Sequence, residues 1–243
     1  MMISAMIDRG DDSNSRTIMK RYIHVIALFV VIFLPGLSAS PRQGRAQASA
    51  VESPPPPPQE EIARSIEGHY RELADLTAQV TQKNRLKALG KTQVFEGRLS
   101  IKKPGRLRID YTNGQVIVLD GKTAMFYSKK NQQIIRRTFG DIDEANVPVA
   151  FLLGAAEISK EFAIAPAEES GPRAIDLAPQ KPGAAMKKLR LKVDEAGRIL
   201  EMTIFDRSGN ITEITFTDVR EGAGVEDKVF TFKVPKGTEI IEQ

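Results

Sequence analysis

The chain has 243 residues, no cysteine, no tryptophan and two histidines. This length suits one folded domain behind a leader segment better than it suits two domains. The absence of cysteine excludes disulfides, thiolate nucleophiles, cysteine-ligated metals and a lipid anchor on cysteine. The formal net charge is +4.

Residues 1–48 have the composition of an export leader. Basic Lys20-Arg21 precedes an almost wholly apolar run over 23–34, and small residues follow that run. This is the order of segments in a secretory signal, and the run is short of the ~20 residues that span a bilayer. We therefore expect export with a cleaved signal peptide, cut after Ala39 or Ala48. An uncleaved anchor is the alternative.

The basic character belongs mostly to the leader. Residues 1–48 hold six basic and three acidic side chains, which leaves 29 basic and 28 acidic in the rest. We therefore expect no nucleic-acid partner. Residues 82–140 nonetheless hold 14 basic side chains against three acidic ones. This asymmetry either steers docking on an acidic protein or an anionic membrane, or merely solvates the outer face of strands.

A linker and then a helix are expected after the leader. Residues 49–58 end in five consecutive prolines, which form a stiff spacer. We expect the folded domain to cover 59–243. It begins with an amphipathic helix of about four turns, because apolar residues recur at helical spacing after Glu60-Glu61. These residues are Ile62, Ile66, Tyr70 and Leu73.

Alternating apolar and polar residues then predict strands with one dry and one wet face. Turns are expected at Pro104-Gly105 and Asp120-Gly121, and a short helix over 147–153. The predicted strands include 76–80, 99–101, 107–111, 115–119, 123–127, 134–135, 189–193, 199–205, 211–219 and 230–234. Sequential short-looped strands favour an α+β fold with an antiparallel sheet. Two helices cover part of its apolar face, and the remainder is either a packed core or a cavity.

The residues that common enzyme mechanisms need are missing. After the leader the chain contains a single histidine, His69, and no Gly-x-Ser-x-Gly sequence accompanies it. One histidine cannot form a histidine cluster for a metal, and there is no glycine-rich phosphate loop. We therefore expect no enzyme activity, no metal and no cofactor.

Several segments taken together resemble the periplasmic lipoprotein carrier family, LolA. They are 79–82, 97–111, 120–122 and 230–237. The resemblance spans Ile62 to Gly237. It implies an open half-barrel whose concave face is covered by helices.

The resemblance also implies a function. The protein would be a periplasmic chaperone that shields lipoprotein acyl chains in a hydrophobic cavity. It would move them, as a monomer, from an inner-membrane release complex to an outer-membrane receptor. Lys103 matches the arginine that latches the helical lid in this family. The alternatives are a carrier of a free lipid or glycolipid, a lipid-responsive regulatory sensor on the same fold, and a β-sheet protein with a solid core.

Five residues are the candidates for lining the cavity. They share one face of successive strands, opposite a row of basic residues, which indicates a single apolar surface. The candidates are Leu99, Ile101, Leu107, Ile109 and Tyr111, and the basic row is Arg98, Lys102, Arg106 and Arg108. We expect Leu107, close to the Pro104-Gly105 turn, to lie at the cavity mouth. The alternative is that all five are ordinary core residues.

Overall fold

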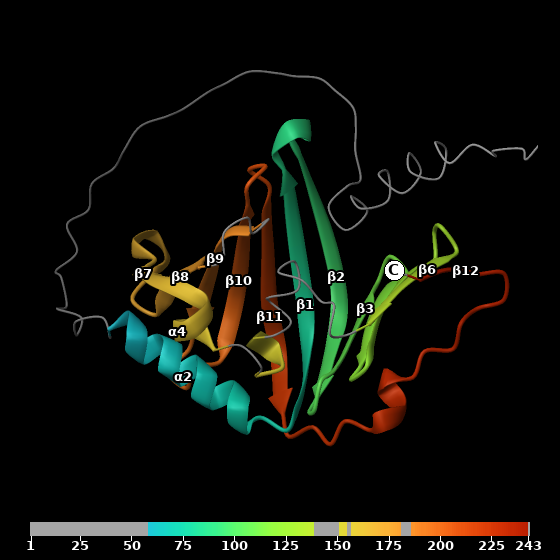
Figure 1. Cartoon of the computed structure of the whole chain (residues 1–243), viewed down its shortest axis with the longest axis horizontal. Coiled ribbons are helices and arrows are strands. Elements are labelled where there is room, and N and C mark those ends of the chain that lie inside the picture. The colour runs from blue at the N-terminus through green and yellow to red at the C-terminus, as the bar shows by residue number, and fades with distance from the viewer. Residues whose placement is uncertain (1–57, 139–150, 155–156, 181–185, 243) are drawn as a thin grey trace, which may run out of the picture. The chain divides into compact units, whose positions relative to one another are not determined.

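The computed structural model describes residues 58–138, 151–154, 157–180 and 186–242 (Figure 1). The expected leader, residues 1–48, lies outside the described residues, as does all of the 49–58 linker except Pro58. Within the described ranges, no helix is long and apolar enough to cross a bilayer.

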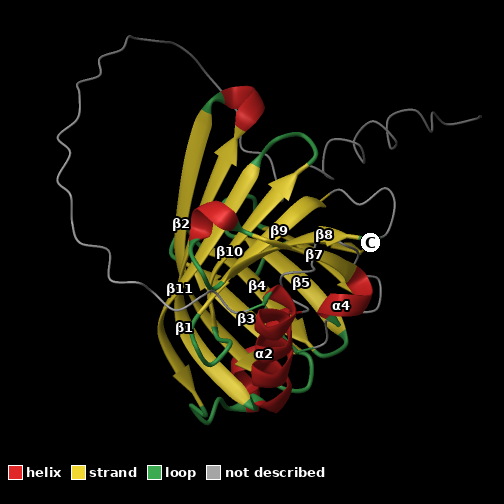
Figure 2. Cartoon of the chain, turned by 90° about the vertical axis from the view of Figure 1, so that its left-hand side faces the viewer, coloured by secondary structure: helices red, strands yellow, loops and turns green. Residues whose placement is uncertain are grey.

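One curved 12-stranded sheet forms the fold, with the strand order β12-β6-β5-β4-β3-β2-β1-β11-β10-β9-β8-β7 (Figures 1 and 2). The sheet is open, because β12 and β7 are edge strands. Neighbouring strands are antiparallel except β12 and β6, which are parallel. The strands are β1 (Asp75–Leu86), β2 (Lys91–Lys102), β3 (Arg106–Tyr111), β4 (Gln115–Asp120), β5 (Thr123–Ser128), β6 (Gln133–Thr138), β7 (Phe162–Pro166), β8 (Ala174–Pro179), β9 (Met186–Val193), β10 (Ile199–Asp206), β11 (Ile211–Glu221) and β12 (Glu239–Glu242). The predicted open antiparallel architecture is confirmed.

The N-terminal helix is the predicted one. Helix α2 (Gln59–Glu72) begins directly after Pro58. It carries two acidic residues in its first turn, where the helix dipole favours negative charge. Its apolar stripe is buried on the concave side of the sheet (Figure 2). The shorter helices are α4 (Ile158–Glu161), η1 (Lys87–Leu89), η4 (Glu168–Ser170) and η5 (Asp227–Phe230). Part of the predicted 147–153 helix lies outside the described residues, and Phe151 and Leu152 are helical.

The strand register places the five candidate residues on one face. Leu99 pairs with Ile109, Ile101 with Leu107, and Gly97 with Tyr111. Directly paired residues in an antiparallel sheet point to the same side. The predicted single apolar surface is therefore confirmed, and it lies on the concave face that α2 covers.

Strand β4 is buried on both faces, which explains its uninterrupted apolar sequence. Ile117 and Leu119 belong to the concave core, while Val116 and Val118 belong to a second cluster on the outer face. Residues 222–238, here called the C-terminal strap, supply Phe232 to this second cluster. Its ring lies 5.1 Å from that of Tyr127.

The prediction of a strand over 230–234 is wrong. Residues 227–230 form η5 instead, and the next strand is β12. The alternating phenylalanines at 230 and 232 arise from packing on the outer face and not from a strand ladder. Arg108 donates to the carbonyls of Val229 and Thr231 at 2.9 and 3.3 Å, and so supplies the hydrogen bonds that a neighbouring strand would otherwise provide.

The outer face of β8 and β9 carries a compact ion cluster. Arg190 and Lys188 both donate to the carboxylate of Asp176 at 2.7 Å. Burial raises the pKa of Asp176, but the hydrogen bonds from Arg190 and Lys188 outweigh it and hold the pKa below its usual value. The cluster therefore stabilises the fold at neutral pH.

We expect Asp176→Asn to lower the free energy of unfolding by about 1 to 3 kcal/mol at pH 7, because the three charge-assisted hydrogen bonds from Lys188 and Arg190 to the carboxylate are weakened or lost. The folded-state pKa is depressed, so the contribution is complete above the ordinary pKa and is lost as pH falls through the folded-state pKa. Urea unfolding from pH 7 to pH 3 should show the two proteins converging. Asp218→Asn, which changes an exposed carboxylate without an ion pair to a described residue, is the control.

Candidate functional site

The concave face has a tightly covered end beneath α2. Leu99, Ile101 and Leu107 are 1%, 0% and 0% exposed. They share one core with the buried face of α2 and with residues 151–153. Leu107 is thus completely enclosed, and the expectation that it lies at the cavity mouth is wrong. Lys103, which precedes the Pro104-Gly105 turn, contacts the C-terminal end of α2.

Exposure of the concave face increases toward the opposite end of the sheet. Ile109 and Tyr111 are only partly buried, and so is Phe95, whose ring meets that of Tyr111 edge-on at 6.1 Å. The Tyr111 hydroxyl donates to Oε1 of Gln82 at 2.7 Å, and burial raises the pKa of Tyr111 to about 12. Of the five candidates, Ile109 and Tyr111 therefore lie nearest the less covered end.

Lys103 holds the C-terminal end of the lid helix. Its Nζ donates to the carbonyl oxygens of Tyr70 and Arg71, the latter at 2.8 Å. These carbonyls belong to the last turn of α2, where helical partners run out and the dipole favours a cation. Burial, followed by the charge of Arg71, lowers the pKa of Lys103. The sequence match to a latch residue therefore corresponds to a direct contact with the helix.

Other polar contacts fix α2 along its length. Oε1 of Glu67 accepts a hydrogen bond from the amide of Ile158 at 2.6 Å, at the start of α4. The amide of Ile199 donates to the Tyr70 hydroxyl at 3.2 Å, and burial raises the pKa of Tyr70 to about 12. His69 lies 3.0 Å from Glu221 at the end of β11. The sequence analysis noticed His69 and Tyr70 but could not assign these contacts, because each joins residues more than 90 positions apart.

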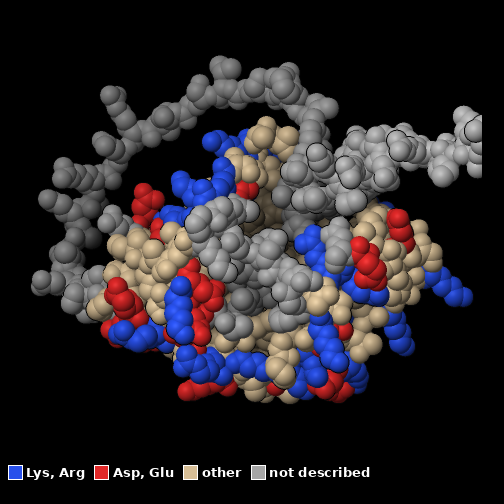
Figure 3. Space-filling view, viewed as in Figure 1, with Lys and Arg blue, Asp and Glu red and all other residues tan. Residues whose placement is uncertain are grey.

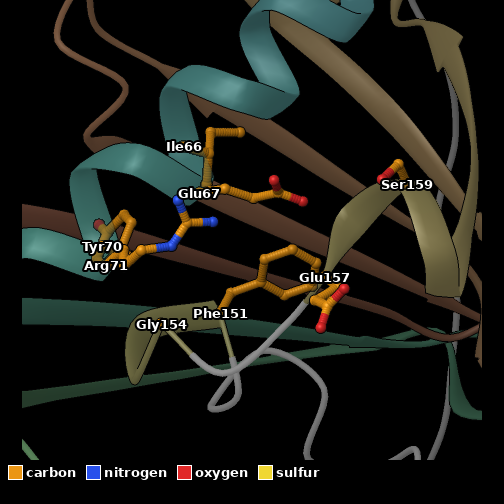
Figure 4. A pocket seen from close by; sticks show the side chains of 8 residues that line it. All are labelled: Ile66, Glu67, Tyr70, Arg71, Phe151, Gly154, Glu157 and Ser159. Atoms are coloured by element: carbon orange, nitrogen blue, oxygen red, sulfur yellow. The ribbon is translucent and has the colours of Figure 1, made fainter.

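A small cavity of about 240 Å³ lies between α2 and residues 151–154 and 157–159 (Figure 4). A Cβ added at Gly154 would come within 2.4 Å of the Tyr70 carbonyl oxygen, so this turn packs directly against the helix backbone. Both polar side chains and the ring of Phe151 line this cavity. Its lining comprises Ile66, Glu67, Tyr70, Arg71, Phe151, Gly154, Glu157 and Ser159.

Within the described ranges, no group of three or more His, Cys, Asp or Glu side chains is arranged to hold a metal ion. His69 lies within hydrogen-bonding distance of Glu221, and no described hydroxyl group forms a hydrogen bond with its ring. The arrangement on the concave side is an apolar face beneath a helix that is attached by a few polar contacts. It suits the binding of an apolar ligand.

The two ends of the concave face should respond differently to a buried charge. Leu107→Glu places a carboxylate in a fully enclosed site and should destabilise the fold by about 3 kcal/mol or more. Ile109→Glu, two residues along the same strand face, should cost clearly less because its carboxylate can reach water. Thermal melting of both variants checks this, and equal melting temperatures would contradict the gradient of burial.

Comparison with known proteins identifies the family of this chain. The family model described as outer membrane lipoprotein carrier protein LolA matches residues 71–233, more than half of the chain. An outer-membrane lipoprotein carrier protein of Chromobacterium violaceum is 30% identical over 199 residues, which cover 81% of this chain and 89% of that protein. The protein of the same description from Pseudomonas aeruginosa is 30% identical over 173 residues, covering 69% and 81%.

Among solved structures, a LolA superfamily protein from Nitrosomonas europaea aligns with a TM-score of 0.41 and 13% identity, covering 72% of this chain and 97% of that one. The family match extends from the end of α2 into the C-terminal strap and so includes every strand but β12. This chain belongs to the LolA family of outer membrane lipoprotein carrier proteins.

Proposed function

We propose that this protein is a periplasmic carrier that binds the acyl chains of lipoproteins on its concave face and moves them from the inner to the outer membrane. The observation that supports this most is the large apolar face beneath a helix held by few polar contacts. Relatives described as outer-membrane lipoprotein carriers support the cargo class and the periplasmic location. Carriage of this kind needs no catalytic group.

Loading requires the lid helix to move. Leu99, Ile101 and Leu107 are already enclosed, so an acyl chain can reach them only where side chains of α2 withdraw. The acyl chain then replaces those side chains as the cover of the same apolar surface. In the empty carrier, α2 thus keeps the binding face out of water. Without this cover the face would be an exposed apolar patch.

The energetics suit a reversible carrier. Burial of an acyl chain contributes about 0.8 kcal/mol per CH₂ group, and a membrane offers a similar gain. Transfer between carrier and bilayer is therefore nearly balanced for the chain itself. The smaller free energy of closing α2 can then decide whether the cargo stays or leaves.

The cargo itself is the most direct check of the proposed function. We expect the protein purified from the periplasm to carry acylated lipoprotein in native mass spectrometry, with an intact mass that also reveals signal cleavage. Free phospholipid or glycolipid as the sole ligand would support the alternative carrier instead. Protein that stays empty after incubation with a triacylated lipopeptide would contradict acyl binding altogether.

Lys103 should control how firmly the lid stays shut. Lys103→Leu removes the donor to the two carbonyls at the end of α2. We therefore expect faster uptake of a fluorescent acyl probe and roughly tenfold faster release. A tenfold change corresponds to a loss of about 1.4 kcal/mol from the free energy that favours the closed lid. Lys103→Arg restores a donor and should behave like the wild type. Lys122→Leu, an exposed lysine in the β4–β5 turn, is the matched control. Unchanged rates for Lys103→Leu would exclude the latch.

A further inference from the structure

The hairpin of β1 and β2 extends beyond its neighbours at the end of the sheet remote from α2 (Figure 1). Strand β3 pairs only with residues 97–102 of β2, so the first half of β2 has no strand partner on that side among the described residues. We call residues 83–94 the β1–β2 prong. It includes η1, where Gly90 adopts a left-handed conformation (φ +57°) that closes the turn.

The prong is strongly basic. Its sequence contains four basic residues and no acidic one. Arg85 is paired with Glu213 at 2.9 Å, but the ammonium groups of Lys83, Lys87 and Lys91 form no hydrogen bond or ion pair with the described part of the chain. Figure 3 shows where lysine and arginine side chains lie on one face of the described surface.

An exposed apolar side chain lies beside one of these lysines. Val94 is 55% exposed, the most exposed large apolar side chain of the described core domain. It pairs directly with Lys83 across the hairpin, so the two side chains share a face. A valine exposed beside an ammonium group matches a headgroup region, where charge and apolar surface meet.

We propose that the prong docks on the surface of an anionic bilayer. Attraction to such a surface needs only clustered positive charge within a Debye length, without matched geometry. The tip of one hairpin is too narrow for a specific protein interface, which requires about 800 Å² on each partner. Lysine, a compact and freely rotating charge, also suits a fluid array of headgroups better than a rigid protein epitope.

Docking there would direct the open end of the concave face at the membrane. Along β2 the concave residues run from partly buried Phe95 at the prong to Leu99 and then fully buried Ile101 beneath the lid. An acyl chain leaving the bilayer at the prong would therefore meet this apolar row end-on. This step rests on the proposed function, whereas the docking itself does not need a cargo.

Vesicle co-sedimentation of the protein purified from the periplasm tests the proposal. We expect binding to phosphatidylcholine vesicles that contain about one third phosphatidylglycerol, weaker binding as salt is raised, and none to phosphatidylcholine alone. Each of Lys83→Gln, Lys87→Gln and Lys91→Gln should lower the partition coefficient about fivefold, and the triple variant roughly 100-fold. Val94→Ser should have a smaller effect.

Two matched controls keep the test specific. Lys122→Gln and Lys236→Gln remove exposed lysines without a described side-chain partner elsewhere on the molecule, and should bind like the wild type. Equal loss in these controls, binding to neutral vesicles, or full binding by the triple variant would overturn the proposal. If the protein carries acyl cargo but does not bind anionic vesicles, the docking proposal alone is contradicted. If it binds vesicles but never an acyl ligand, the carrier function is contradicted.

Discussion

The structure depends on how a wide, one-sided sheet keeps its apolar face out of water. The described strands form an open sheet and not a barrel, with β7 and β12 as its edges. Helix α2 covers part of the concave face and is attached there by a few side-chain hydrogen bonds. Lys103 matters because it binds the carbonyls that the end of any helix leaves unpaired. The proposed function requires this cover to be displaced while the sheet beneath it stays folded.

The β2–β3 hairpin binds one segment of the chain on each face of the sheet. On the concave side Lys103 holds α2, and on the outer side Lys102 and Arg106 hold Asp227 of the C-terminal strap at 2.7 and 2.6 Å. Successive side chains of a strand point to opposite faces, so one short turn can anchor two unrelated segments. The strap in turn covers the second apolar cluster and leads to β12. The β2–β3 hairpin is therefore bound on its outer side independently of its contact with α2.

Local patterns predicted most of the elements, and long-range contacts explain what they missed. Period-two alternation located β3, parts of β1 and β2, and the face shared by Leu99 and Ile109, while a continuous apolar run located β4. Helical spacing located α2 within a residue or two. The strand predicted over 230–234 was wrong because its alternation reflects Phe230 and Phe232 packing sideways on the sheet. Strand β8 was not predicted, since it is buried on both faces around the Asp176 ion cluster. The enclosure of Leu107 was equally hidden, because it depends on residues that come together only in the fold.

The central claim is that acyl chains bind where α2 now lies, so the helix must move for loading. The chain contains no cysteine, which permits His69→Cys and Glu221→Cys to be joined by a short thiol cross-linker across a contact of 3.0 Å in the native protein. We predict that the cross-linked protein stays folded but no longer takes up a triacylated lipopeptide, whereas the uncross-linked double variant does. Normal uptake by the cross-linked protein would contradict the account.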